Sequence, residues 1–279
     1  MSFAVGEIAA RCSVITGAAS GIGRELAFCA ADNGMAVALA DRNFAGLQET
    51  ANAIEAKGGR CMIKMVDVSD TDAVKAFADE VFDWAPSVAM IFSNAGVMKI
   101  TDGLRPDLQE WSRAIAVNLL GTVNMVHAFM SRLVDSADWA QFVFVGSMAS
   151  FIAVPKLSSY GATKHAVWGL VDTLRVELAE VDTKVALSFV APGPVRTPFN
   201  DEYYEHVKRD YGETAVQEYS ALQADPADVA KKIFCLAREG EFLIIPTTQP
   251  MYPQIKARYD KIFEAERRGF ITRLSKKPS

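Results

Sequence analysis

Short runs of apolar residues alternate along the chain with longer segments of helical character. Runs of this length are typical of buried strands, and the longer segments are typical of helices. Strands are predicted near residues 12–16, 35–40, 61–66, 88–92, 141–146, 185–190 and 242–245. Regular alternation of this kind implies right-handed crossovers and a parallel sheet that is covered on both faces. We therefore predict an α/β fold with a doubly wound parallel sheet of about seven strands flanked by helices.

The chain shows no repeat, linker or low-complexity segment, so a single domain is expected over residues 1–279. Its length and its 50% hydrophobic content suffice for one large core. A formal net charge of −5 argues against a nucleic-acid-binding surface. The 4 cysteines are widely spaced, with no Cys-x-x-Cys and no His cluster, so reduced thiols and no metal site are expected. With neither a signal peptide nor an unbroken apolar run of ~18 residues, we expect a cytoplasmic protein without a membrane span.

A glycine-rich turn follows the first predicted strand and precedes a helical pattern. The turn reads Thr16-Gly17-Ala18-Ala19-Ser20-Gly21-Ile22-Gly23. Backbone N–H groups and the dipole at the start of a helix attract a diphosphate, and glycines let the backbone approach it closely. Gly17, Ser20, Gly21, Ile22 and Gly23 are therefore candidate cofactor-binding residues. The alternative is a tight turn without a ligand.

The second predicted strand ends at Asp41, in register with the glycine-rich turn. An acidic side chain at this place can bind the adenosine ribose hydroxyls, and it repels a 2′-phosphate. This favours NAD over NADP. Arg42 instead favours NADP, because a basic group here could bind a 2′-phosphate. Asp41 could also be a capping residue of the loop.

Tyr160 and Lys164 are four residues apart in a predicted helix and therefore share one face. A lysine ammonium beside a phenol stabilises the phenolate and lowers the pKa of the tyrosine. Such a tyrosine can act as a general acid and base near neutral pH. An isolated Tyr-x-x-x-Lys pair is also common as an exposed polar contact. Motifs elsewhere in the chain are needed to choose between this interpretation and a catalytic pair.

Seven motifs occur in the order and at about the spacing of the short-chain dehydrogenase/reductase family. They cover roughly residues 11–245 and comprise Thr16-Gly17-x-x-x-Gly21-Ile22-Gly23, Asp67-Val68, Asn94-Ala95-Gly96, Asn118, Ser147, Tyr160-x-x-x-Lys164 and Pro192-Gly193. The chain resembles this family closely. The resemblance implies a Rossmann-type fold, a nicotinamide cofactor and hydride transfer to or from a carbonyl carbon.

The resemblance assigns four catalytic residues, Asn118, Ser147, Tyr160 and Lys164. Tyr160 is then the acid and base, and Ser147 binds the substrate oxygen. Lys164 lowers the pKa of Tyr160 and binds the nicotinamide ribose, and Asn118 holds a water in a proton relay. Further cofactor contacts implied by the resemblance are Asp67, Val68, Asn94, Ala95, Gly96, Pro192, Gly193, Val195 and Thr197, together with Tyr160 and Lys164.

Residues 199–222 interrupt the strand–helix alternation at the place where relatives carry a mobile substrate lid. The segment holds four of the seven tyrosines. A lid over an apolar or aromatic substrate is one interpretation, and an amphipathic helix pair packed on the body is the other. The candidate substrate contacts are Met98, Met148, Phe151, Leu157, Pro194, Phe199 and Tyr203.

This set is apolar and lacks a clear anion-binding group, which suits a hydrophobic ligand. We predict an NAD-dependent oxidoreductase acting on a hydrophobic, aromatic or similarly bulky, secondary alcohol or ketone. An NADPH-dependent carbonyl reductase is the first alternative, and a non-catalytic dinucleotide-binding regulator is the second.

The C-terminal part departs from the family pattern. Relatives often end in a short strand and a Gly-rich tail used in tetramers, whereas here a helical extension is predicted over residues 250–279, with the helix near 254–268 and a basic solvated tail. A homodimer through the long helices near 106–134 and 158–180 is therefore expected, and a homotetramer less so.

Overall fold

The seven strands form one sheet in which every neighbouring pair runs parallel. The computed structural model describes residues 8–85, 87–136, 138–247 and 252–267. The strand order is β3-β2-β1-β4-β5-β6-β7. The strands are β1 (Cys12–Thr16), β2 (Ala36–Asp41), β3 (Cys61–Met65), β4 (Val88–Ser93), β5 (Ala140–Val145), β6 (Val185–Val190) and β7 (Leu243–Ile244). The predicted α/β class with a doubly wound parallel sheet is confirmed.

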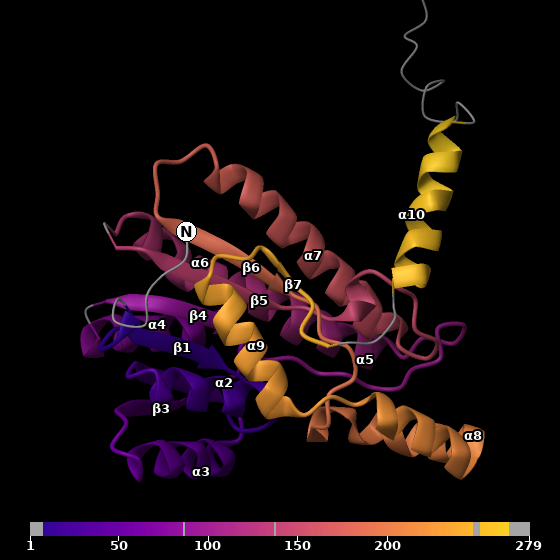
Figure 1. Cartoon of the computed structure of the whole chain (residues 1–279), viewed down its shortest axis with the longest axis horizontal. Helices are drawn as coiled ribbons and strands as arrows, with labels where there is room; N and C mark the ends of the chain where they lie inside the picture. Colours follow the sequence, from indigo (N-terminus) through magenta and orange to yellow (C-terminus); the bar gives the residue numbers. More distant parts are fainter. Residues whose placement is uncertain (1–7, 86, 137, 248–251, 268–279) are drawn as a thin grey trace, which may run out of the picture.

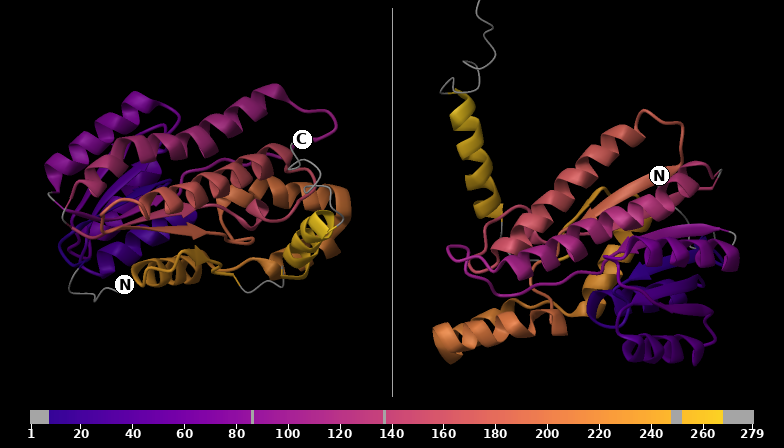
Figure 2. Two further views of the ribbon diagram at one scale, coloured as in Figure 1. Left: turned by 90° about the horizontal axis from the view of Figure 1, so that it is seen from above. Right: turned by 180° about the vertical axis from the view of Figure 1, so that it is seen from behind.

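Helices cover both faces of the sheet (Figures 1 and 2). The helices before β5 are α2 (Gly21–Asp32), α3 (Phe44–Glu55), α4 (Thr71–Trp84), α5 (Leu108–Ala114), the π-helical turn η1 (Ile115–Leu120) and α6 (Gly121–Val134). After β5 come the short 3-10 turn η2 (Met148–Ser150), α7 (Ser158–Leu178), the 3-10 turn η3 (Pro198–Asn200), α8 (Asp201–Leu222), α9 (Pro226–Arg238) and α10 (Tyr252–Arg267).

Two separate cores follow from this layering. Leu26 of α2, Leu47 of α3 and Phe234 of α9 pack on one face of the sheet. Phe129 of α6 and Val171 of α7 pack on the other face, with residues of α4. Adjacent residues in a strand point to opposite faces, so strands buried on both faces, such as β5, read as continuous apolar runs in the sequence.

The strand order reverses between β1 and β4, because β1 connects outward to β2 and β4 connects outward to β5. In open α/β sheets a crevice forms at the carboxyl ends of the strands at such a point. The fold therefore directs attention to the turns after β1, β4, β5 and β6.

One helical stretch, Leu108–Val134, is long and apolar enough to cross a membrane by length and mean hydropathy alone. Half of its most apolar window is buried inside the protein, and Met125 and Phe129 belong to the core. Buried core helices meet the same criteria, so this stretch is read as a core helix.

The C-terminal helix α10 extends away from the sheet (Figures 1 and 2). It begins at Tyr252, close to the predicted start, and the basic tail from residue 268 lies outside the described residues. Arg258 Nη1 donates to the Phe151 carbonyl at 3.2 Å and contacts His165 Nε2 at 2.6 Å. The His165 Nδ1 lies 2.8 Å from the Gly161 carbonyl. His165 thus joins α10 to α7.

Two glycines offer a matched test of this packing. A Cβ added at Gly146, just after β5, would overlap the ring of the buried Phe189, whereas a Cβ at Gly169 in α7 would meet nothing within 4 Å. Gly146→Ala should therefore destabilise the fold by about 1–3 kcal/mol through overpacking. Gly169→Ala should stabilise it by up to about 1 kcal/mol, since alanine is the better helix former. Urea denaturation measures both, and equal shifts of the two midpoints would contradict this packing.

Candidate active site

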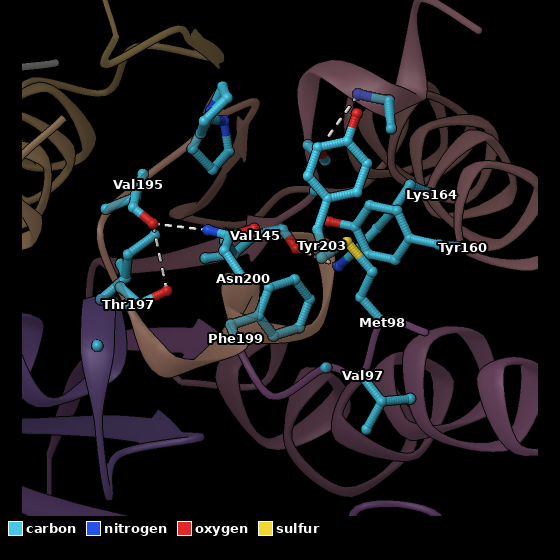
Figure 3. A pocket seen from close by; sticks show the side chains of 18 of the residues that line it. Val97, Met98, Val145, Tyr160, Lys164, Val195, Thr197, Phe199, Asn200 and Tyr203 are labelled. Carbon is cyan, nitrogen blue, oxygen red and sulfur yellow. Dashed lines mark hydrogen bonds between the residues drawn. The ribbon is translucent and has the colours of Figure 1, made fainter. Parts of the chain in front are cut away.

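A cavity of about 520 Å³ lies at the crevice where the strand order reverses. Its walls come from the turn after β1, the end of β2, the loops after β4, β5 and β6, and helices α7 and α8. Figure 3 shows Tyr160, Lys164, Phe199 and Tyr203 around this space. Segments far apart in the sequence therefore converge on one site.

The glycine-rich turn is shaped as a cradle that side chains would fill. Gly17 has a φ of +68°, and a Cβ there would lie 2.8 Å from Asn94 Nδ2. A Cβ at Gly23 would overlap the Gly17 carbonyl oxygen. Helix α2 begins here with no side-chain cap from Ser20 and no acidic residue in its first turn. A helix start with neither a side-chain cap nor an acid in its first turn fits a diphosphate.

A hydrogen-bonded junction holds this turn against the end of β4. Thr16 Oγ1 accepts from the backbone N–H groups of Asn94 and Ala95 at 3.0 and 3.1 Å. The Asn94 amide Nδ2 donates to the carbonyl of Thr16 at 2.9 Å. These contacts with β1 hold Asn94, Ala95 and Gly96, three of the predicted cofactor residues, in place. They form the floor of the cavity.

Asp41 lines the cavity at the end of β2, as predicted from the sequence. Its carboxylate accepts from the backbone N–H of Ala19 at 3.1 Å and from that of Asn43 at 2.9 Å. Arg42 also lines the cavity, and its guanidinium lies 3.6 Å from the Asp67 carboxylate. The charge that could favour a 2′-phosphate is therefore already paired with an acid.

Three predicted cofactor residues do not line the cavity: Gly23, Asp67 and Val68. Gly23 contributes only by leaving room for the Gly17 carbonyl. Asp67 is half-exposed beside Arg42, and hydrogen bonds from Ser69 lower its pKa. Val68 is buried in the core. The other predicted cofactor contacts all line the cavity: Gly17, Ser20, Gly21, Ile22, Asp41, Arg42, Asn94, Ala95, Gly96, Tyr160, Lys164, Pro192, Gly193, Val195 and Thr197.

Tyr160 and Lys164 lie on the buried face of α7. Burial raises the pKa of Tyr160 to about 12, and a hydrogen bond with the Ser147 hydroxyl opposes this rise. Burial lowers the pKa of Lys164 to about 8. Lys164 Nζ donates to the Val145 carbonyl at 2.9 Å and lies 5.7 Å from the Tyr160 ring centroid. Burial is the largest influence on the pKa of each group.

Ser147 comes directly after the loop residue Gly146 and lines the cavity with Tyr160. Its hydroxyl accepts from the Ala149 backbone N–H at 3.1 Å, which begins η2. This bond leaves the hydroxyl proton available. A serine hydroxyl and a phenol thus face the same space, where both can bind one substrate oxygen.

Asn118 does not line the cavity but supports its wall from the π-helical turn η1. Its Oδ1 accepts from the Val97 N–H at 2.7 Å, and its Nδ2 donates to the Val97 carbonyl at 2.9 Å. A Cβ at Gly96 would lie 3.2 Å from Asn118 Oδ1 and 3.7 Å from Lys164 Nζ, so the amide and the ammonium are close. π-Helical turns are frequent at functional sites because they displace one side chain from the helical register.

Six of the seven predicted substrate contacts line the cavity, namely Met98, Met148, Leu157, Pro194, Phe199 and Tyr203. The seventh, Phe151, does not. Its ring packs edge-on against Trp168 at 5.0 Å and Phe189 at 6.0 Å in the core. The turn after η2 directs the next residue, Ile152, to the cavity instead.

Sequence reasoning also missed several wall residues: Val97, Ala149, Ile152, Asn200 and Leu222. The predicted substrate contacts are neighbours of these residues, taken from the loops that line the substrate site in the family. Only the apolar character of Ile152 and Leu222 offered a signal, and apolar residues are far more often core than cavity wall. Among the described residues, no group of three His, Cys, Asp or Glu side chains could hold a metal ion.

The sequence matches the model of the short chain dehydrogenase family over residues 11–208. A curated relative, the probable oxidoreductase EphD of Mycobacterium tuberculosis, is 37% identical over 183 residues, which cover 66% of this chain and 31% of EphD. The chain therefore matches less than a third of the length of that relative. The uncharacterized oxidoreductase Lin0452 of Listeria innocua is 28% identical over 247 residues, covering 85% of this chain and 96% of Lin0452.

Solved structures agree with these matches. A short chain dehydrogenase/reductase from Burkholderia phymatum in complex with NAD superposes with a TM-score of 0.83 at 26% identity, covering 98% of both chains. An alcohol dehydrogenase from Thermococcus sibiricus complexed with 5-hydroxy-NADP superposes with a TM-score of 0.73 at 25% identity, covering 84% of this chain and 95% of that one. Because the family match runs from β1 into α8, over more than half of the chain, the chain belongs to the short-chain dehydrogenase/reductase family.

Proposed function

We propose that the protein transfers a hydride between NAD(H) and a hydrophobic secondary alcohol or ketone. The observation that carries the proposal is one cavity in which Tyr160 and Ser147 face an apolar wall, next to a glycine cradle and Asp41. A general acid and base beside a dinucleotide site is the arrangement that this chemistry requires. The apolar wall favours a ligand with a bulky hydrocarbon part.

A bound nicotinamide dinucleotide would supply the hydride acceptor or donor, and the residues of the chain would do the rest. In alcohol oxidation, Tyr160 as phenolate accepts the hydroxyl proton. Ser147 donates a hydrogen bond to the same oxygen and fixes its position. Lys164 is held at the Val145 carbonyl, where its ammonium lies near the phenol. Asn118 positions Val97 in the wall.

NAD is proposed over NADP because the two acidic groups near the adenosine end oppose a 2′-phosphate. Asp41 would meet the ribose hydroxyls, and its carboxylate already binds the glycine-rich turn through Ala19. Asp67 neutralises Arg42. Relatives of this fold bind either cofactor, so the choice depends on these local charges.

Asp41→Ala should weaken NAD binding and narrow the preference for NAD over NADP. A hydrogen bond to a charged group contributes ~1.5–3 kcal/mol, so a change of roughly tenfold or more in the ratio of kcat/KM values is expected. Asp41→Asn is the matched control, because it removes the charge but keeps one oxygen acceptor for the turn. The ratio is measured with both cofactors under one substrate. A preference unchanged in both variants would refute the assignment of Asp41.

Alcohol oxidation should speed up with rising pH, because it requires the Tyr160 phenolate. Burial raises the pKa of Tyr160 to about 12, so the phenolate fraction grows roughly tenfold per pH unit below the pKa. The Ser147 hydrogen bond lowers this pKa, and Ser147→Ala should therefore move the rise in kcat/KM to higher pH. Ketone reduction requires the phenol and should lack this rise.

Tyr160→Phe is the control for this profile. It removes the ionisable phenol, so it should reduce turnover by about 10²–10⁴-fold and abolish the rise of alcohol oxidation with pH. A pH profile that is identical in Ser147→Ala and the unaltered protein would contradict the coupling of the two hydroxyls.

A homodimer is proposed as the assembly, with the outer faces of α5, α6 and α7 as the interface. Leu108 of α5, Val123 of α6 and Val176 of α7 are exposed large apolar residues, as is Leu120 at the end of η1. Exposed apolar groups that gather on one face favour association.

Cytoplasmic localisation, inferred from the sequence alone, is likewise proposed.

Sedimentation equilibrium should give a mass of about twice 30.4 kDa. Val123→Glu should shift the protein toward monomer, because it places a charge in the proposed interface. Leu104→Glu, in the loop before α5, should leave the mass unchanged. A monomer at all concentrations would argue against the dimer.

A further inference from the structure

The lid segment α8 is folded back on itself rather than straight. Gly212 has a φ of +83° and a ψ of −179°, which break the helix into two segments. The rings of Tyr203 and Tyr219 lie on opposite sides of this break, yet their centroids are 5.1 Å apart. Sixteen residues of unbroken helix span about 24 Å, so the second segment has to return along the first.

The C-terminal end of this hairpin is held by the loop after β6. Val195 forms a parallel bridge with Ala224, and Arg196 pairs with Asp225 at 2.8 Å. Near the start of the hairpin, Glu202 accepts from the backbone N–H of Ile100 at 3.1 Å. The hairpin is thus fixed at its base.

A second cavity of about 270 Å³ lies between the two segments. Tyr203, Tyr219 and Leu222 line both this cavity and the catalytic one. Pro155, from the loop between η2 and α7, lines the second cavity from the side of the body. The two spaces are therefore neighbours that share one aromatic wall.

The shared wall continues as a row of rings away from Tyr160. Tyr203 contacts Tyr219 at 5.1 Å and His206 at 6.0 Å, and His206 contacts Tyr211 at 5.8 Å. The phenol of Tyr219 also interacts electrostatically with that of Tyr160, which supports the closeness of the two cavities. Each ring of the row offers a flat apolar face and carries a hydrogen-bonding group at its edge.

The second cavity also has polar lining residues that the catalytic cavity lacks. His206 lies there with only 4% of its surface exposed. Its Nδ1 faces Asp210 at 3.1 Å and Arg209 at 3.2 Å. Glu218 and Tyr211 also line this cavity and not the catalytic one. A ligand that filled it would meet aromatic rings together with hydrogen-bonding groups that the catalytic cavity does not offer.

We propose that this second cavity is a distal substrate subsite. It makes the enzyme selective for elongated alcohols or ketones that contain rings and carry a hydroxyl or similar polar group at the end remote from the reacting carbon. The inference rests on the proposed function, because the subsite shares three lining residues with the cavity that holds Tyr160 and Ser147. The fit is to a ligand of two or more rings, since a volume of about 270 Å³ is added beyond the catalytic cavity. A short ligand would leave the hairpin unused.

Three secondary alcohols test this proposal with NAD: 1-phenylethanol, 1-(biphenyl-4-yl)ethanol and 1-(4′-hydroxybiphenyl-4-yl)ethanol. Their kcat/KM values should rise in this order. Burial of an added apolar group in a fitted pocket changes kcat/KM by roughly 10–200-fold, so at least a tenfold gain from first to third is expected. Equal values for the three alcohols would overturn the subsite.

Ala215→Phe should abolish the gain, because residue 215 lines only the second cavity and its side chain would fill it. Thr214→Phe is the matched control, since Thr214 is exposed and lines neither cavity. Glu218→Trp fills the cavity from an exposed position and replaces Ala215→Phe if that variant fails to fold. A gain that persists in a folded, filled variant would overturn the proposal.

Calorimetric titration of the same alcohols separates failure of the subsite from failure of the reaction. Tighter binding of the third alcohol, lost in Ala215→Phe and kept in Thr214→Phe, supports the subsite even without turnover, and the missing turnover then counts against the proposed function. Equal binding of the first and third alcohols overturns the subsite whatever the turnover.

Discussion

The close approach between the turn after β1 and the end of β4 is the constraint on which the site depends. Thr16 contributes a hydroxyl that binds two backbone N–H groups of the neighbouring loop. Gly17 and Gly23 leave no side chain in the space between the two segments. Because the turn is held in this position, α2 begins at the crevice and Asp41 can reach Ala19. Any bulk inserted at this junction would displace the cofactor cradle and the cavity floor together.

Burial acts in opposite directions on the two groups of the catalytic pair. It raises the pKa of Tyr160 to about 12 and lowers that of Lys164 to about 8. A low-dielectric surrounding penalises whichever form carries charge, so both groups are driven toward neutrality. Burial therefore favours the phenol form of Tyr160 and weakens the preference of Lys164 for its ammonium form. The carbonyl of Val145 compensates part of the cost of keeping that ammonium buried.

Much of the fold could be predicted from the sequence, because β4 and β5 are buried on both faces and read as continuous apolar runs. The glycine-rich turn and the Tyr160 face were predictable for a similar reason, since local spacing determines which side chains meet. Phe151 was misplaced because one residue of rotation in η2 decides between core and cavity. The reversal of direction within α8 could not be predicted from the sequence. A glycine such as Gly212 also occurs in straight helices, and only its backbone angles show that the helix breaks there.

The hydrogen bonds of Arg258 reach the Phe151 carbonyl and His165 across 107 and 93 residues of sequence. His165 adjoins Lys164, so these contacts brace the part of α7 that carries the catalytic pair. Contacts between such distant residues close long loops and form late in folding. During synthesis α7 is made before residue 258, so these contacts can form only after α10 has been made. The helix that carries Tyr160 and Lys164 therefore acquires its full set of neighbours only with the C-terminal part of the chain.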